Sequence, residues 1–248
     1  MINIRGLKKR LGDKEVLNGV DLDIETGETV VVVGRSGTGK SVLLKHIIGL
    51  MTPDAGTITI DGEEIVGLSE RDLDHVRMRF GVLFQSAALF DSLTVGENVA
   101  LAMRMHKKLT EAEIQQGVAD RLEWVGLAGA EKMKPASLSG GMRKRVGLAR
   151  AIAMEPQFIL YDEPTTGLDP IMADAIDELI RSLQKRLGVT SVVVTHDIPS
   201  AYKVGDRIAM LHEGKVIFSG TPEETRGTTN PMVRQFIEGS STGPIRAL

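Results

Sequence analysis

The chain has 248 residues, of which 42% are hydrophobic and 25% charged, a composition typical of a globular protein with one large domain or two modest ones. The formal net charge of -3 argues against a protein that binds nucleic acid through an overall basic surface, so we expect no nucleic-acid partner. The lack of cysteine excludes disulfides, thiol catalysis and cysteine-ligated zinc.

The sequence also indicates the cellular location of the protein. Its first twelve residues, MINIRGLKKRLG, contain no apolar stretch long enough for the core of a signal peptide. No run approaches the roughly 18 apolar residues that a membrane-spanning helix needs. We therefore expect a cytoplasmic protein that reaches a membrane only through a partner.

The first sixty residues alternate short β-rich runs with turns. This pattern predicts strands at Ile2 to Leu7, Val20 to Ile24, Thr29 to Val33 and Thr57 to Ile60, with one helix from about Lys40 to Leu50.

The middle of the chain has a helical pattern. Three capping boxes predict helix starts around a short strand at Phe80 to Phe84: Ser69 with Asp72, Thr94 with Glu97, and Thr110 with Glu113. The stretch from about 86 to 155 is therefore predicted to be a helical subdomain.

After Pro156 the pattern returns to strands and helices in alternation. It predicts strands at Phe158 to Tyr161 and Ser191 to Thr195, a helix at Ile171 to Leu187, and a hairpin over Ile208 to Phe218. Strands interleaved with helices favour an α/β fold with a mostly parallel sheet.

A glycine-rich motif follows the strand at Thr29 to Val33. Residues 34–41 read GRSGTGKS and fit G-x-x-x-x-G-K-[ST], between that strand and a helix. Glycines let backbone N–H groups surround phosphate oxygens, and the N-terminus of the helix favours an anion. Lys40 could contact the β and γ phosphates, and the Ser41 hydroxyl could bind Mg²⁺. The alternative is a glycine-rich turn without a ligand.

Two other strands end in polar residues. The strand at Phe158 to Tyr161 leads into Asp162, which could hold Mg²⁺, and Glu163, which could orient or deprotonate an attacking water. His196 follows the strand at Ser191 to Thr195 and could donate to a γ-phosphate oxygen. Without a phosphate loop the carboxylates would be read as an ordinary solvated loop. The other histidines are interpreted as surface or packing residues: His46, His75, His106 and His212.

A further motif, LSGG at residues 138–141, precedes an amphipathic helix that runs to about Met154. Together with the strand ending in Asp162 and Glu163, it resembles the signature of ATP-binding cassette (ABC) transporter ATPases. The family's motifs occur in order over residues 1–220: GRSGTGKS at 34–41, Gln85, the signature, EPTTGLD at 163–169, and His196.

The resemblance implies an ABC ATPase cassette at residues 1–220. Its fold would be a P-loop NTPase with a RecA-like core, an antiparallel β subdomain and the inserted helical subdomain, followed by a C-terminal helix and flexible tail at 221–248. The implied cofactors are ATP and Mg²⁺.

The resemblance also assigns roles to residues. Glu163, His196 and Gln85 would be catalytic, and Ser41, Gln85 and Asp162 would bind the metal. The nucleotide would be bound by Gly34, Arg35, Ser36, Gly37, Thr38, Gly39, Lys40, Ser41 and Val42, and from a second copy by Ser139, Gly140, Gly141 and Asp169. Two copies would thus pack head to tail around two ATP molecules, and Gln85 would link the site to a transmembrane permease.

The chain departs from the family at two places. Where members usually carry an aromatic residue to stack on adenine, this chain has Leu11, so Leu11, Val16 or Arg10 is expected to substitute. Met142 replaces the commonest residue after the signature, and the resulting string LSGGMRKR resembles the subgroup that serves Mla and Mce-type lipid transport. Residues 90–99 and 230–236 also resemble that subgroup, whereas AMRMH at 102–106 does not.

That subgroup implies an MlaE-like permease, with an Mce-domain substrate-binding protein as a further candidate partner. The chain would then lie on the cytoplasmic face of the inner membrane. An importer subunit for an amino acid or a metal is the alternative. Other phosphate-loop ATPases would leave Ser139 to Met142 without a role, and DNA-repair or translation cassettes normally need a longer chain. A cassette that binds ATP without hydrolysing it is disfavoured by Glu163 and His196.

The C-terminal residues contain an apolar stripe. Met232, Val233, Phe236 and Ile237 fall on one face of a short helix that would start at Asn230 and Pro231. This helix is expected to pack on its own cassette, or residues 244–248 reach across to hold a second copy.

Overall fold

The structure is a computed structural model that describes residues 1–106 and 108–246. The chain divides into two compact units, which are described separately. The first unit comprises Met1–Leu73 and Val192–Leu248, and the second comprises Asp74–Ser191.

The first unit contains an antiparallel sheet of strand order β2-β1-β4-β5. Its strands are β1 (Ile2–Leu11), β2 (Lys14–Ile24), β4 (Ala55–Ile60) and β5 (Glu63–Glu64). Both β1 and β2 are longer than the sequence pattern predicted, because their charged ends pair through the backbone around the turn at Gly12. A ladder of backbone hydrogen bonds needs no apolar side chains, so hydropathy alone misses such an extension.

The first unit also contributes strands β10-β9-β3-β8, in this order, to a second sheet. They are β3 (Thr29–Val33), β8 (Thr190–Thr195), β9 (Arg207–His212) and β10 (Lys215–Gly220). β3 pairs with β9 in parallel, and β9 pairs with β10 antiparallel, so the sheet is mixed. Every residue of β3 is buried, which explains its continuous run of valines.

Four helices accompany these strands: α1 (Lys40–Ile47), α7 (Ile198–Val204), α8 (Pro222–Gly227) and α9 (Pro231–Glu238). α9 begins as expected, because Asn230 accepts hydrogen bonds from the backbone of Met232 and Val233. The additional helix α8 packs on β10, and the apolar pattern gave no sign of it because only its capping box distinguishes it.

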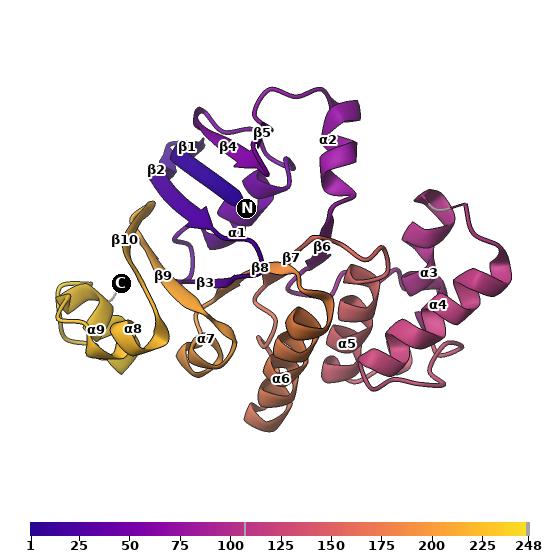
Figure 1. The fold of residues 1–248 in the computed structure, drawn as a ribbon. Coiled ribbons are helices and arrows are strands. Elements are labelled where there is room, and N and C mark those ends of the chain that lie inside the picture. Colours follow the sequence, from indigo (N-terminus) through magenta and orange to yellow (C-terminus); the bar gives the residue numbers. More distant parts are fainter. Residues whose placement is uncertain (107, 247–248) are drawn as a thin grey trace. The chain divides into compact units, whose positions relative to one another are not determined.

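The second unit joins a pair of parallel strands to a group of helices. β6 (Phe80–Leu83) pairs with β7 (Phe158–Asp162), and the rings of Phe80 and Phe158 stack with centroids 4.9 Å apart. Helices α3, α4 and α5 pack against one another, as Figure 1 shows. The helices are α2 (Glu70–Arg77, which begins in the first unit), α3 (Val95–His106), α4 (Glu111–Trp124), η1 (Pro135–Ser137), α5 (Gly140–Ala151) and α6 (Pro170–Leu187).

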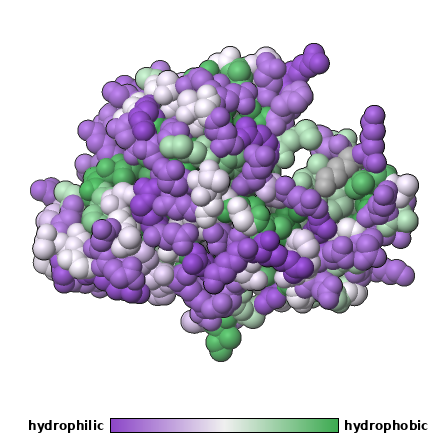
Figure 2. Space-filling model, viewed as in Figure 1, coloured by the Kyte–Doolittle hydropathy of each residue, from purple (hydrophilic) through white to green (hydrophobic). Residues whose placement is uncertain are grey.

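The three predicted capping pairs all form hydrogen bonds, and those of Thr94 with Glu97 and Thr110 with Glu113 are reciprocal, as in a complete capping box. In the view of Figure 2, hydrophilic residues cover most of the visible surface and hydrophobic residues form separate patches. No helix within residues 1–106 and 108–246 combines the length and apolar character needed to cross a membrane.

Candidate functional site

The glycine-rich loop between β3 and α1 has a backbone that requires glycine. Gly37 and Gly39 have φ angles of 77° and 101°, in the left-handed region. A Cβ atom on Gly39 would lie 2.9 Å from both the Cγ1 atom and the carbonyl oxygen of Val16. The loop therefore lies directly against β2, and this packing leaves no space for a side chain.

Lys40, the first residue of α1, is folded over this loop. Its side chain is buried, and its Nζ atom donates hydrogen bonds to the carbonyl oxygens of Gly34 at 2.7 Å and Arg35 at 3.2 Å. Ser41 and Val42 follow in the first turn of α1. The positive helix end, the buried ammonium and the glycine backbone together form a cradle suited to phosphate.

A cavity of about 660 Å³ lies beside the loop in the same unit. Lys14 and Val16 line it together with Arg35 to Thr38, and the Lys14 ammonium donates to the carbonyl oxygen of Gly37 at 3.4 Å. Val16, one of the predicted substitutes for the missing aromatic residue, is thus at this cavity. Leu11 is 43% exposed at the end of β1 and is not among the lining residues.

His196 also belongs to the first unit and follows β8 as predicted. It is exposed, just before α7, whose N-terminus is capped by Asp197.

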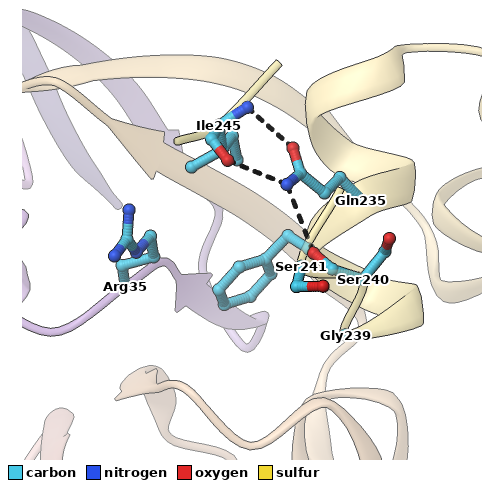
Figure 3. A pocket seen from close by; sticks show the side chains of 7 residues that line it. Arg35, Gln235, Gly239, Ser240, Ser241 and Ile245 are labelled. Atoms are coloured by element: carbon cyan, nitrogen blue, oxygen red, sulfur yellow. Dashed lines mark hydrogen bonds between the residues drawn. The ribbon is translucent and has the colours of Figure 1, made fainter. Parts of the chain in front are cut away.

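The C-terminal segment returns to the same unit (Figure 3). The Gln235 amide accepts a hydrogen bond from the backbone N–H of Ile245 at 2.7 Å and donates to its carbonyl oxygen at 2.8 Å. The side chain of Ile245 is buried, and the Arg35 guanidinium donates to the carbonyl oxygen of Arg246 at 2.7 Å. Residues 245 and 246 thus contact their own unit, and the expectation that residues 244–248 reach a second copy stays a prediction. Residues 247 and 248 lie outside the described residues.

In the second unit, Gln85 and Glu163 follow neighbouring parallel strands. Asp162 ends β7, and Glu163 is buried with a φ angle of 49°, a left-handed conformation that is uncommon outside glycine. The Thr166 hydroxyl donates to the Glu163 carboxylate at 3.0 Å. The predicted catalytic glutamate is therefore held in one orientation.

Lys144 in α5 connects these residues, and the sequence analysis did not single it out. Its Nζ atom donates to the carbonyl oxygen of Gln85 at 2.5 Å and to that of Glu163 at 3.0 Å. Burial lowers the pKa of Lys144, and the nearby carboxylates of Asp162 and Glu163 oppose this shift. In the sequence Lys144 is one of several basic residues on a helix, and only its place on the buried face distinguishes it.

The signature residues start α5. Ser139 is exposed, and its hydroxyl accepts a hydrogen bond from the backbone of Met142 at 3.2 Å. A Cβ atom on Gly141 would meet the terminal methyl group of Met172 on α6, and the two helices are in contact. Asp169 caps α6 by accepting two backbone hydrogen bonds at 3.0 Å. The Ser139 hydroxyl and the Asp169 carboxylate thus each cap the helix that follows, and both residues are exposed.

These features define a nucleoside-triphosphate-binding protein of the P-loop class, with an α/β fold that includes mixed and antiparallel sheets. Comparison with known proteins identifies the family. The family described as ABC transporter matches residues 17–166, and the chain belongs to it. It is an ABC-type ATPase.

Individual relatives match nearly the whole chain. A probable ribonucleotide transport ATP-binding protein, mkl, of Mycobacterium leprae is 44% identical over 98% of this chain and 70% of its own. The intermembrane phospholipid transport system ATP-binding protein MlaF of Haemophilus influenzae is 42% identical over 99% of this chain and 93% of its own. The dimeric ATP-binding cassette MJ0796, in a post-hydrolysis state with ADP and Pi, has a TM-score of 0.83 and 34% identity over 90% of this chain and 99% of its own.

Proposed function

We propose that this chain is the ATP-hydrolysing subunit of a transporter that moves phospholipid between membranes. The observation that carries the lipid cargo is the 42% identity with MlaF over almost the full length of both chains. Mkl, whose name gives ribonucleotide as cargo, matches equally well but over a smaller share of its own length. The string LSGGMRKR at the signature favours the same subgroup.

Each site residue has a role in this proposal. The loop from Gly34 to Ser41 and the N-terminus of α1 bind the phosphates, and Lys40 supplies positive charge to the β and γ phosphates. Glu163 accepts a proton from the water that attacks the γ-phosphorus, as the bond to the bridging oxygen of ADP breaks. His196 donates to a γ-phosphate oxygen, and Gln85 positions the water. Buried Glu163 has a fixed carboxylate, which lowers the cost of reaching the reactive geometry.

The proposed metal is Mg²⁺. Ser41, Asp162 and Gln85 offer hydroxyl, carboxylate and amide oxygens, the hard donors that this ion prefers. In the part of the chain that the structure describes, no group of three or more histidine, aspartate or glutamate side chains forms a metal site. Phosphate and water oxygens are further ligands that Mg²⁺ would take from its substrate and solvent. When bound, Mg²⁺ supplies charge that stabilises the transferring phosphoryl group.

The proposed partners are a second copy and a permease. Ser139, Gly140 and Gly141 at the N-terminus of α5 would bind the nucleotide held by the second copy, in a head-to-tail pair. The dimeric state of the MJ0796 cassette supports this assembly. An MlaE-like permease and an Mce-domain protein would complete the transporter, with this chain on the cytoplasmic face of the inner membrane.

The cargo can be tested with the assembled complex. The chain, co-purified with its permease, is reconstituted in vesicles that contain a fluorescent phospholipid, and lipid movement is followed with and without ATP. We expect ATP-dependent movement of the lipid, absent when the complex carries Glu163→Gln. ATP-dependent uptake of a ribonucleotide, an amino acid or a metal ion without movement of lipid would overturn the lipid cargo and leave the ATPase activity standing.

A further inference from the structure

One face of α5 lies against the segment that follows β6. Lys144, Gly147 and Arg150 are three residues apart and so share this face. The Arg150 guanidinium donates to the carbonyl oxygens of Ala87 and Ala88, each at 2.6 Å. A Cβ atom on Gly147 would lie 2.6 Å from the Leu83 side chain at the end of β6 and 3.1 Å from the Cβ atom of Ala87, so the segment is packed directly on the helix.

Lys144 differs from Arg150 because it contacts two separate segments of the chain, one after β6 and one after β7. Its ammonium group donates to the carbonyl oxygens of both Gln85 and Glu163, at 2.5 Å and 3.0 Å. These are the backbone positions from which two of the proposed catalytic side chains extend. One buried side chain thereby ties both positions to the same helix.

The contact matters because Glu163 has an unfavourable backbone conformation. With a φ angle of 49°, it lies in the left-handed region, which a residue with a side chain occupies only when its surroundings hold it there. The carbonyl oxygen of Glu163 accepts hydrogen bonds from Lys144 and from the backbone N–H of Thr166, the latter at 3.3 Å. The Thr166 hydroxyl fixes the carboxylate.

The ammonium group is also close to negative charge. The carboxylates of Asp162 and Glu163 attract its positive charge. A neutral side chain of the same length would lose both the hydrogen bonds and this attraction.

We propose that Lys144 is a positioning residue for ATP hydrolysis, which sets the backbone of Gln85 and Glu163 according to the position of α5. This inference rests on the proposed role of Glu163. α5 begins beside Ser139, about 7.5 Å along the helix axis from Lys144. If α5 shifts when Ser139 contacts the nucleotide of a second copy, Lys144 would move with the helix and change the position of the Glu163 backbone.

Two substitutions separate positioning from binding. Lys144→Met keeps the length of the side chain and removes its donors, and we expect kcat to fall at least about tenfold while KM for ATP stays within about twofold. Lys144→Arg restores the charge and the donors, and should recover most of the lost kcat. Lys185→Met, at an exposed lysine on α6, is the matched control and should change neither constant.

A second experiment asks whether Lys144 acts through Glu163. In a Glu163→Gln background, Lys144→Met should lower the residual rate far less than it does alone, because residues that act together are not additive. If Lys144→Met does not fold, Lys144→Gln, which keeps amide donors on a shorter side chain, must show a smaller loss that is again confined to kcat.

Three results would overturn the inference. They are an unchanged kcat in Lys144→Met, a change in KM as large as the change in kcat, and a loss in the Glu163→Gln background as large as the loss in the wild type. Near-normal turnover of Glu163→Gln alone would instead contradict the proposed role of Glu163, so the two failures are distinguishable.

Discussion

The phosphate loop of the first unit and the Gln85 to Glu163 region of the second unit both need left-handed backbone, but they obtain it differently. The loop uses glycine at Gly37 and Gly39, where a positive φ costs little. The second unit places Ala87, Ala88 and Glu163 at φ angles of 61°, 45° and 49°. There the conformation is held by Lys144 and Arg150, side chains from α5.

The difference shows which residues determine each backbone geometry. In the loop it is encoded in eight consecutive residues, so substitutions there should act locally and mainly on ATP binding. In the second unit it depends on residues 19 to 63 positions away in the sequence, so substitutions on α5 should act on turnover or on stability.

The largest effect on ATP binding is expected for Gly39→Ala. A Cβ atom there would clash with Val16 and would place a non-glycine residue at a φ angle of 101°. Strain of about 2 to 3 kcal/mol would weaken ATP binding by roughly 100-fold, measurable by titration calorimetry. Gly27→Ala, at a φ angle of 79° with nothing within 4 Å, is the control and should leave affinity unchanged. Equal affinities for both variants would show that the loop does not depend on its packing against β2.

Arg150→Met tests the second region. Loss of the guanidinium would remove the donors for the carbonyl oxygens of Ala87 and Ala88 and should lower the free energy of unfolding by about 1.5 to 3 kcal/mol. Urea denaturation gives this value, and ATP affinity measured in parallel should be unchanged. A loss of affinity without a loss of stability would reverse the expected contrast between the two regions.

These two regions also show how much of the fold and of the site can be predicted from the sequence. The strand, loop and first helix around Lys40 were predicted because their residues are consecutive, and so were the capping at Thr110 and the strand ending in Asp162. The sequence did not predict three features: the ends of β1 and β2, helix α8, and the contacts of Lys144. Each depends on pairing or packing between residues far apart in the sequence, which periodicity does not report. The fold class and the family followed from the order of the motifs, whereas the roles of individual site residues stay predictions.

A truncation after Gly239 examines the C-terminal segment. Because Ile245 is buried in its own unit, removing the segment should lower the free energy of unfolding by about 1 to 2 kcal/mol, less than full burial of an isoleucine gives, since ordering of the chain opposes it. ATPase activity should keep the same dependence on protein concentration. A steeper dependence after truncation would instead show that the segment holds a second copy.

The smallest effect is expected for Leu11→Tyr. If the end of β1 faces adenine, an aromatic ring there should tighten ATP binding by about 0.5 to 1.5 kcal/mol. Equilibrium binding of ATP to the wild type and the variant measures the change. An unchanged dissociation constant would place the base elsewhere, and the cavity lined by Val16 would then be the position to examine by substitution.

The most direct test of the account is to measure ATP binding and turnover on the same preparation of Glu163→Gln. We expect ATP binding close to that of the wild type and turnover lower by about 100-fold or more, the loss expected when a general base is removed. Glu123→Gln, at an exposed position on α4, should change neither quantity. Turnover near the wild-type rate in Glu163→Gln would contradict the account, because Glu163 would then not act on the water.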